Sequence, residues 1–228
     1  MKRFVPRLRA LGHWLLEPTC AGCALSPAPL LCADCARRSH RLPRHCRCCN
    51  HRLSDPALSH CQRCRSASPL NALFVERRYD GLNRELLLRA KFGRDARALA
   101  VLRAWLPALD EALPPATVLL PIPSSGRRLV QRGFNLAALL AKTLARRQQL
   151  PLNLRLLQRQ ERPPQSLQLG SPARRRNIRD AFYLTGPAPA SVLLVDDVLT
   201  SGATLEEAAR CLRAGGAGAV FALCLLGK

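Results

Sequence analysis

One short segment near the end of the chain restricts the fold more than any other part of it. Residues 192–195 are apolar, and Asp196 and Asp197 follow them directly. A turn of small residues, Thr200-Ser-Gly-Ala-Thr204, comes next, and a helical pattern begins at Leu205. A buried strand that passes through a tight turn into a helix is typical of α/β proteins. The segment therefore predicts an α/β fold with a parallel sheet.

The same alternation of short apolar runs and amphipathic stretches extends through the second half of the chain. It predicts strands at Thr117–Ile122, Val192–Val195 and Ala219–Leu226, and helices at Asn135–Gln148 and Leu205–Ala214. Upstream, a strand is expected at Ala72–Tyr79, a helix from Asn83 as its N-cap to Gly93, and a second helix over Ala96–Leu113. This order indicates a parallel sheet flanked by helices.

The small-residue turn has the chemistry of a phosphate site. At the start of the following helix, free backbone N–H groups and the helix dipole converge on one point, which suits a dianionic phosphate. The hydroxyls of Thr200, Ser201 and Thr204 add donors, and Gly202 lets the backbone approach the ligand closely. Ala203 is the fifth predicted ligand-binding residue of this turn.

The two carboxylates before the turn are candidates for binding a sugar or a metal ion. Asp196 and Asp197 are expected at the carboxyl edge of the sheet, where open α/β folds bind ligands. There they can accept hydrogen bonds from ribose hydroxyls or hold Mg²⁺ through water. The alternative is an ordinary capped helix after a buried strand. The order of strand, acid pair and T-S-G-A-T turn favours the ligand site.

Residues 1–68 carry nine of the eleven cysteines, and eight of these nine form C-x-x-C pairs. Each pair puts two thiolates on one side of a tight turn, and two such turns enclose a tetrahedral zinc ion. Disulfides fit this segment poorly because no secretion signal is visible. We expect structural zinc held by Cys20, Cys23, Cys32, Cys35, Cys46, Cys49, Cys61 and Cys64.

The pairing of these cysteines is not determined by their spacing. Closure in sequence order gives one site from the first four and a second from the last four. The second site has three competing ligands, His45, Cys48 and His60. Cys211 and Cys224 fall in helix and strand patterns and are expected in the core.

The net charge of +21 indicates a polyanionic partner or a generally basic surface. The longest apolar run, Ala217–Leu226, is far below the roughly 20 residues of a membrane span. Residues 1–16 favour an amphipathic helix over a signal peptide, because Arg7 and Arg9 interrupt the apolar stretch. A cytoplasmic protein without a membrane span is expected.

Several motifs together resemble a known family. The segment around T-S-G-A-T looks like the signature of type I phosphoribosyltransferases, in which it binds the ribose 5-phosphate of phosphoribosyl pyrophosphate (PRPP). Further motifs are similar to the ComF family, which includes the GntX-like proteins: Lys91-Phe-Gly93, Pro121-Ile-Pro123, Arg127, Arg128, Gln131-Arg-Gly-Phe-Asn135, Pro163-Pro-Gln-Ser166 and Arg174-Arg-Arg-Asn177.

The resemblance implies a cysteine-rich module of double zinc-ribbon type at residues 1–68 and a type I phosphoribosyltransferase-like domain at 69–228. It places a pyrophosphate loop after the strand that ends near Ile122 and a mobile lid loop at Gln165–Asn177. Some members of the family act in DNA uptake during natural competence, which implies single-stranded DNA and a competence helicase as partners.

In the pyrophosphate loop, Ser124, Ser125 and Gly126 would supply backbone N–H groups, and Arg127 and Arg128 would clamp the diphosphate. A solvated basic turn is the rival interpretation of these five residues. Lys91 either complements the dipole of its helix or reaches into the ligand site.

Two functions remain open at this point. The first is a ligand-binding ComF-like protein that acts in DNA uptake during transformation. The second is an active phosphoribosyltransferase that uses PRPP and Mg²⁺ on an unknown, nucleobase-type acceptor. In that case Asp196 and Asp197 would stabilise the positive charge that builds on the ribose.

Overall fold

The computed structural model describes residues 18–41, 46, 68–109, 113–160 and 180–228. The chain divides into two compact units. One comprises Met1–His40 and Asp80–Ala104, and the other comprises Arg41–Tyr79 and Trp105–Lys228.

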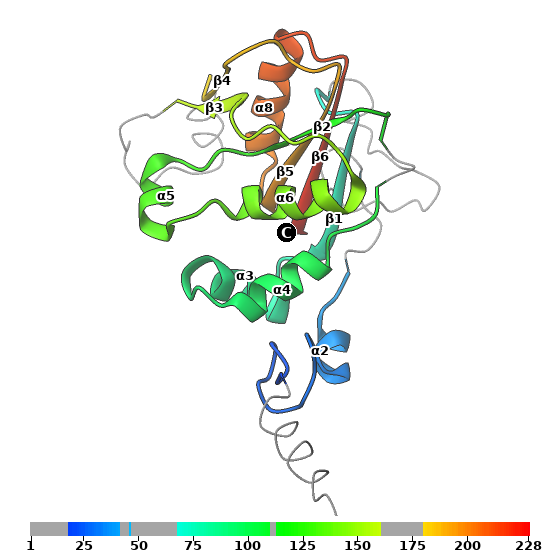
Figure 1. The fold of residues 1–228 in the computed structure, drawn as a ribbon, viewed down its shortest axis with the longest axis vertical. Coiled ribbons are helices and arrows are strands. Elements are labelled where there is room, and N and C mark those ends of the chain that lie inside the picture. Colours follow the sequence, from blue (N-terminus) through cyan, green and yellow to red (C-terminus); the bar gives the residue numbers. More distant parts are fainter. Residues whose placement is uncertain (1–17, 42–45, 47–67, 110–112, 161–179) are drawn as a thin grey trace, which may run out of the picture. The chain divides into compact units, whose positions relative to one another are not determined.

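The larger unit is built on a four-stranded sheet with the order β1-β6-β5-β2 (Figure 1). All three strand pairs are parallel. The strands are β1 (Ala72–Arg78), β2 (Val118–Pro121), β5 (Ser191–Leu199) and β6 (Ala219–Gly227). The five residues of β5 from Ser191 to Val195 are buried, as expected for a central strand covered on both faces.

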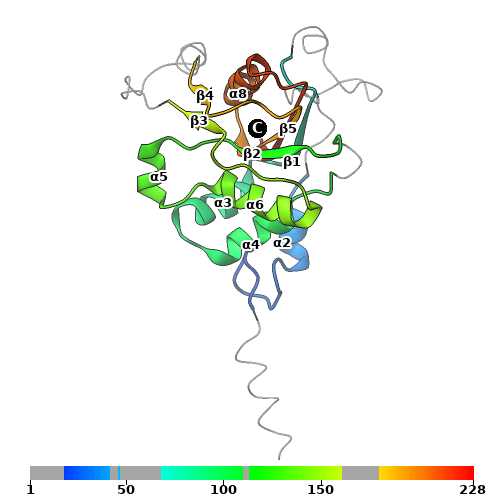
Figure 2. The ribbon, with the colours of Figure 1, turned by 45° about the horizontal axis from the view of Figure 1, so that its top comes forward.

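Helix α8 (Ala203–Ala214) covers one face of this sheet, and helix α6 (Leu136–Gln148) contacts β5 and β2 (Figure 1). Alternate strand residues such as Val192, Leu194 and Val220 share a core cluster with Leu205 and Leu212 of α8. The buried face of α6 contributes nothing to that cluster, which places α6 on the opposite face of the sheet. A short antiparallel pair, β3 (Leu157–Arg159) and β4 (Phe182–Leu184), lies beside α8 (Figure 2).

The direction of the crossovers reverses between β2 and β5. After β2, the chain passes through α6 to an isolated parallel bridge between Leu152 and Leu119 at the outer edge of β2. After β5, α8 leads in the other direction, to β6. In open α/β sheets this reversal opens a crevice at the carboxyl ends of the two strands, where ligands bind.

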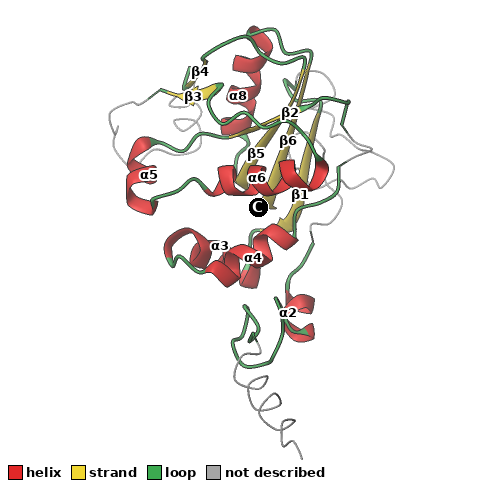
Figure 3. Ribbon diagram, in the orientation of Figure 1, coloured by secondary structure: helices red, strands yellow, loops and turns green. Residues whose placement is uncertain are grey.

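The smaller unit joins the first two cysteine pairs to helices α2 (Ala33–Arg38), α3 (Gly81–Phe92) and α4 (Ala96–Ala104) (Figure 3). Fully buried Asn83 connects two of these helices. The Ser39 hydroxyl donates to Asn83 Oδ1 (2.7 Å), and Asn83 Nδ2 donates to the carbonyl of His40 (3.1 Å). Arg97 of α4 donates to the Thr19 hydroxyl, beside Cys20 (2.8 Å).

The predicted fold class is confirmed: an α/β protein with a parallel sheet flanked by helices, preceded by a cysteine-rich module. The prediction that Asn83 caps a helix was wrong, because α3 begins at Gly81 and the Asn83 side chain bonds residues 39 and 40. The helix expected over 96–113 ends at Ala104, shortly before Pro107. In the described part of the chain, no helix combines the length and apolarity needed to cross a membrane.

Candidate functional site

The small-residue turn Thr200–Thr204, predicted to bind phosphate and called the phosphate turn below, joins β5 to α8 at the carboxyl edge of the sheet. Thr200 and Ser201 are exposed, and Gly202 is the N-cap residue of α8 with φ 76° and ψ −12°. No side chain caps this helix end, and the first helical bond runs from the Glu206 N–H to the Gly202 carbonyl (2.9 Å). The turn is therefore an exposed helix N-terminus with hydroxyls beside it, a geometry suited to an anion.

Asp196 and Asp197 lie within β5, which continues to Leu199 and pairs with β6 over that length. The Asp197 N–H donates to the Asp196 carboxylate (2.8 Å). Both carboxylates are half-buried and lie near the fully buried Cys224 thiol. Burial raises the pKa of Cys224, and the charges of Asp196 and Asp197 raise it further. The acid pair therefore concentrates negative charge directly before the phosphate turn.

The loop after β2 is the second part of the site. Ser124 and Ser125 are half-buried, and Ser125 is the N-cap residue of the short helix α5 (Gly126–Arg132). Arg127 and Arg128, expected in a loop, lie in the first turn of this helix, and their side chains fall outside the described part of the structure.

Strand pairing brings these two loops together. Pro121 is the register partner of Val195, and the Ile122 N–H donates to the Val195 carbonyl (2.8 Å). The Ser124–Arg128 segment therefore leaves the end of β2 next to the part of β5 that carries the acid pair, where the crossovers reverse. Lys91, half-buried in the last turn of α3, belongs to the smaller unit. The predicted lid loop, Gln165–Asn177, lies outside the described residues.

The first two cysteine pairs form a compact cluster in the smaller unit. The sulfur atoms of Cys20, Cys23, Cys32 and Cys35 all lie within 4.8 Å of one another. The Cys23 and Cys32 sulfurs are 3.9 Å apart. Zinc–sulfur bonds of about 2.3 Å give sulfur separations of about 3.8 Å in a tetrahedron. The donor set therefore fits a tetrahedral zinc ion, and the predicted closure of the first two pairs in sequence order agrees with this cluster.

Backbone amides support the thiolate form of two cluster residues. The N–H groups of Gly22 (3.3 Å) and Cys32 (3.2 Å) donate to the Cys20 sulfur. Burial raises the pKa of Cys20, but amide hydrogen bonds outweigh it and lower that pKa to about 6. Amides of the following turn also lower the pKa of Cys23. Burial and the neighbouring sulfurs raise the pKa of Cys35 to about 12, so a metal ion that binds this sulfur would have to displace its proton.

Gly22 is the close-packed point of the cluster. A Cβ atom at this position would lie 2.7 Å from the Cys35 sulfur, closer than Cβ atoms in proteins approach other side chains. The glycine therefore allows the first C-x-x-C turn to close over the second. Such a site, with four protein ligands, holds its metal for structure rather than catalysis.

The second predicted zinc site cannot be traced in the same way. Cys46 is fully buried, whereas Cys49, Cys61 and Cys64 lie outside the described residues. Cys224 lies in the core, and Cys211 is partly buried against it, as predicted.

Asn135 contacts the second loop of the site, although its sequence motif suggested no such role. The residue belongs to the quoted Gln131–Asn135 motif, and its side chain donates to the carbonyl of Ile122 at the start of the second loop (2.9 Å). The signal that could have found it is its position as N-cap of the helix expected there.

Comparison with known proteins finds relatives named as competence and DNA utilization proteins. Competence protein ComFC of Bacillus subtilis is 30% identical over 199 residues, covering 82% of this chain and 80% of that protein. DNA utilization protein YhgH of Escherichia coli K12 is 30% identical over 226 residues, covering 95% and 92%. Competence protein F of Haemophilus influenzae is 30% identical over 197 residues, covering 80% and 84%.

No protein-family profile matches the chain. Among solved structures, the chain is similar to the adenine phosphoribosyltransferase of Leishmania tarentolae, with 17% identity, coverage of 61% and 75%, and a TM-score of 0.36. The enzyme of Leishmania donovani gives 15% identity, coverage of 71% and 85%, and the same TM-score. At this TM-score the likeness carries no weight. The 30% identity to the bacterial proteins extends over most of their length and is the finding that shows the family. This chain belongs to the ComF family of competence and DNA utilization proteins.

Proposed function

We propose that this protein is a cytoplasmic ComF-like protein that binds a phosphorylated ribose of the PRPP type and acts in the handling of DNA during uptake. The observation that best supports this ligand is the pairing of β2 with β5. It puts an exposed helix N-terminus with an acid pair beside a serine-glycine loop that leads into a basic helix.

Each part of this edge has a role in the proposal. The turn Thr200–Thr204 receives the 5-phosphate on its amides and hydroxyls. Asp196 and Asp197 accept the ribose hydroxyls or hold Mg²⁺ through water. The loop of Ser124, Ser125 and Gly126, with Arg127 and Arg128 in α5, receives the diphosphate.

A calorimetric titration with PRPP and Mg²⁺ tests the ligand. We expect saturable binding to the wild type and none to the double variant Asp196→Asn, Asp197→Asn. The neutral amides of the variant cannot balance the charge of Mg²⁺, and they accept only weaker, uncharged hydrogen bonds from the two ribose hydroxyls. Asp34→Asn is the matched control, since Asp34 is an exposed carboxylate of α2 paired with Arg37. Absence of binding to a folded, zinc-loaded wild type would contradict the proposal.

A working phosphoribosyltransferase is the second candidate, and the acid pair beside the phosphate turn supports it. In that reaction the bond between C1 and the pyrophosphate oxygen breaks, and the diphosphate leaves with the electron pair. A ring nitrogen of the acceptor then bonds C1 and loses its proton. Mg²⁺ would supply charge neutralisation on the diphosphate. Release of pyrophosphate from bound PRPP in the presence of a nucleobase would distinguish this candidate from ligand binding.

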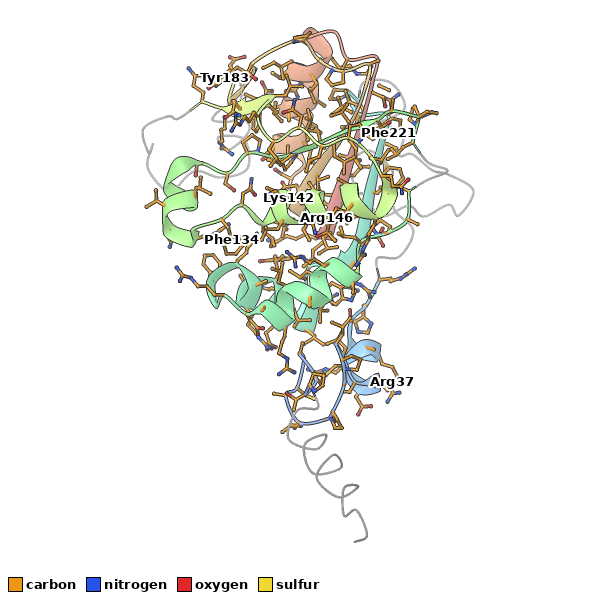
Figure 4. The ribbon with its side chains drawn as sticks, viewed as in Figure 1. Arg37, Phe134, Lys142, Arg146, Tyr183 and Phe221 are labelled. Carbon is orange, nitrogen blue, oxygen red and sulfur yellow. The ribbon has the colours of Figure 1, made fainter. Side chains whose placement is uncertain are left out.

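Single-stranded DNA is the proposed macromolecular partner, and the charge supports it. The net charge is +21, and Lys142 and Arg146 lie exposed on α6 (Figure 4). In gel-shift titrations at increasing salt, we expect the affinity for single-stranded DNA to fall steeply, because bound counterions are released from the phosphates. We expect no change on Asp196→Asn. An affinity that does not depend on salt would contradict binding through surface charge.

A further inference from the structure

The Gln131–Asn135 motif lies next to the loop proposed to bind the diphosphate. In the structure it forms the junction between α5 and α6, where Phe134 lies (Figure 4). Gly133 ends α5 in the left-handed conformation, with φ 78°, and its N–H donates to the Leu129 carbonyl (2.7 Å). Asn135 then begins α6 as its N-cap residue.

The Asn135 side chain makes two different hydrogen bonds. Its Oδ1 accepts from the Ala137 N–H (3.0 Å), which is an ordinary N-cap. Its Nδ2 donates to the carbonyl of Ile122 (2.9 Å), thirteen residues earlier in the chain. The second bond is not needed for capping, because a carboxylate or a hydroxyl caps a helix as well as an amide does.

Ile122 is thereby held from two sides. Its N–H donates to the Val195 carbonyl of β5, and its carbonyl accepts from Asn135. The side chain is 5% exposed, so the residue is a fixed point of the sheet edge. After Ile122 the chain leaves the sheet for twelve residues, which include the two serines and α5. It comes back to Ile122 at Asn135.

The tether joins the two ends of that excursion. Leu136, Ala137 and Leu140 of α6 are buried, so the helix start is fixed by packing. Through Asn135 this fixed helix start also holds the Ile122 carbonyl, and hence the direction in which the chain enters Pro123 and Ser124. Binding groups on a loop act well only when residues behind them fix the loop geometry.

We propose that Asn135 is a positioning residue for the diphosphate-binding loop, residues 123–128; this inference rests on the proposed function. Asn135 strengthens binding of the diphosphate of PRPP. It does not affect binding of the 5-phosphate, which takes place at Thr200–Thr204.

The test compares two ligands, PRPP and ribose 5-phosphate, each titrated calorimetrically with Mg²⁺. Asn135→Asp retains the cap but has no donor for Ile122. We expect its affinity for PRPP to fall about tenfold, the size of effect that the loss of one part-buried hydrogen bond can have. We expect its affinity for ribose 5-phosphate to change less than about twofold. A general loss of structure would weaken both ligands together.

Two further variants separate the tether from other effects. Asn135→Ser also retains the cap, is too short to reach Ile122, and adds no charge, so it should show the same selective loss. Asn153→Asp is the matched control, because the Asn153 side chain accepts from the amides of Arg155 and Leu156 in its own turn, bonds that an aspartate can also make. It should leave both affinities unchanged.

The outcomes distinguish the two proposals. A selective loss of PRPP affinity in both Asn135 variants supports the positioning role. An unchanged ratio of the two affinities in both, in a wild type that binds PRPP, overturns the positioning role alone. A selective loss in Asn135→Asp without one in Asn135→Ser also overturns it, because the added charge would then explain the effect. A wild type that binds neither ligand overturns the proposed function together with this inference.

Discussion

If the cluster of Cys20, Cys23, Cys32 and Cys35 holds zinc, as its geometry allows, removal of the metal is expected to unfold α2 and loosen the start of α3. Helix α2 has 6 residues, no side-chain cap, and only Cys35 as a buried residue. Isolated helices shorter than about 12 residues are marginal in water, so in the zinc-loaded protein the bonds from the cluster to the metal would stabilise this one.

The effect should extend to α3 through Asn83. When α2 unfolds, the Asn83 side chain loses the Ser39 hydroxyl and the His40 carbonyl, and its buried amide is left without these partners. Leaving a buried polar group unpaired costs about 1–3 kcal/mol. Hydrogen exchange measured by mass spectrometry, with and without a chelator, checks this. We expect exchange to rise roughly tenfold or more in residues 18–41 and 80–84.

The exchange of β5 and β6 is the internal reference, because both are central, buried strands. Gly22→Ala should reproduce the effect without a chelator, since its Cβ would lie 2.7 Å from the Cys35 sulfur. Gly186→Ala is the matched control, because its Cβ would meet only Leu156, at an ordinary 3.8 Å. Unchanged protection of residues 18–41 after complete removal of the metal would contradict a structural role for zinc.

The local order of elements could be predicted from the sequence, because each depends on neighbouring residues. The apolar run at Val192–Val195 and the helical pattern at Leu205–Ala214 predicted β5 and α8. The strand continues to Leu199, however, because pairing with β6 holds Val198 and Leu199 in extended form. No local pattern indicates such a partner, so the acid pair could be predicted near the strand end but not within the strand.

Contacts between distant residues could not be predicted. Asn83 has the local character of an N-cap, yet its partners lie 43 and 44 residues away and bury it inside α3. Helix α5 was missed because its seven residues, Gly126–Arg132, include three arginines and no helical apolar pattern. The cysteine spacing indicated metal-binding turns, because each C-x-x-C turn is a local structure. It did not determine that the first two pairs would join, since that contact depends on the fold of the chain between them.

Substitution of Gly202 is expected to have the second large effect, on the phosphate turn itself. Gly202 has φ 76°, a conformation that costs a residue with a Cβ about 1–2 kcal/mol and that β-branched residues hardly adopt. Space is not the limit, because a Cβ would meet Leu199 and Glu206 only at 3.8 and 4.0 Å. In Gly202→Val the backbone must therefore strain or turn away.

Because the amides at the start of α8 follow Gly202 directly, a change in its backbone redirects the groups proposed to hold the phosphate. We expect Gly202→Val to lower the free energy of unfolding by about 2 kcal/mol and to weaken PRPP binding roughly tenfold or more. Chemical denaturation and calorimetry measure the two effects. Gly202→Asn separates conformation from bulk, since asparagine adopts the left-handed region. It should retain most of the stability and bind PRPP more tightly than the valine variant does. Equal binding by the valine variant and the wild type would mean that the ligand does not depend on this turn.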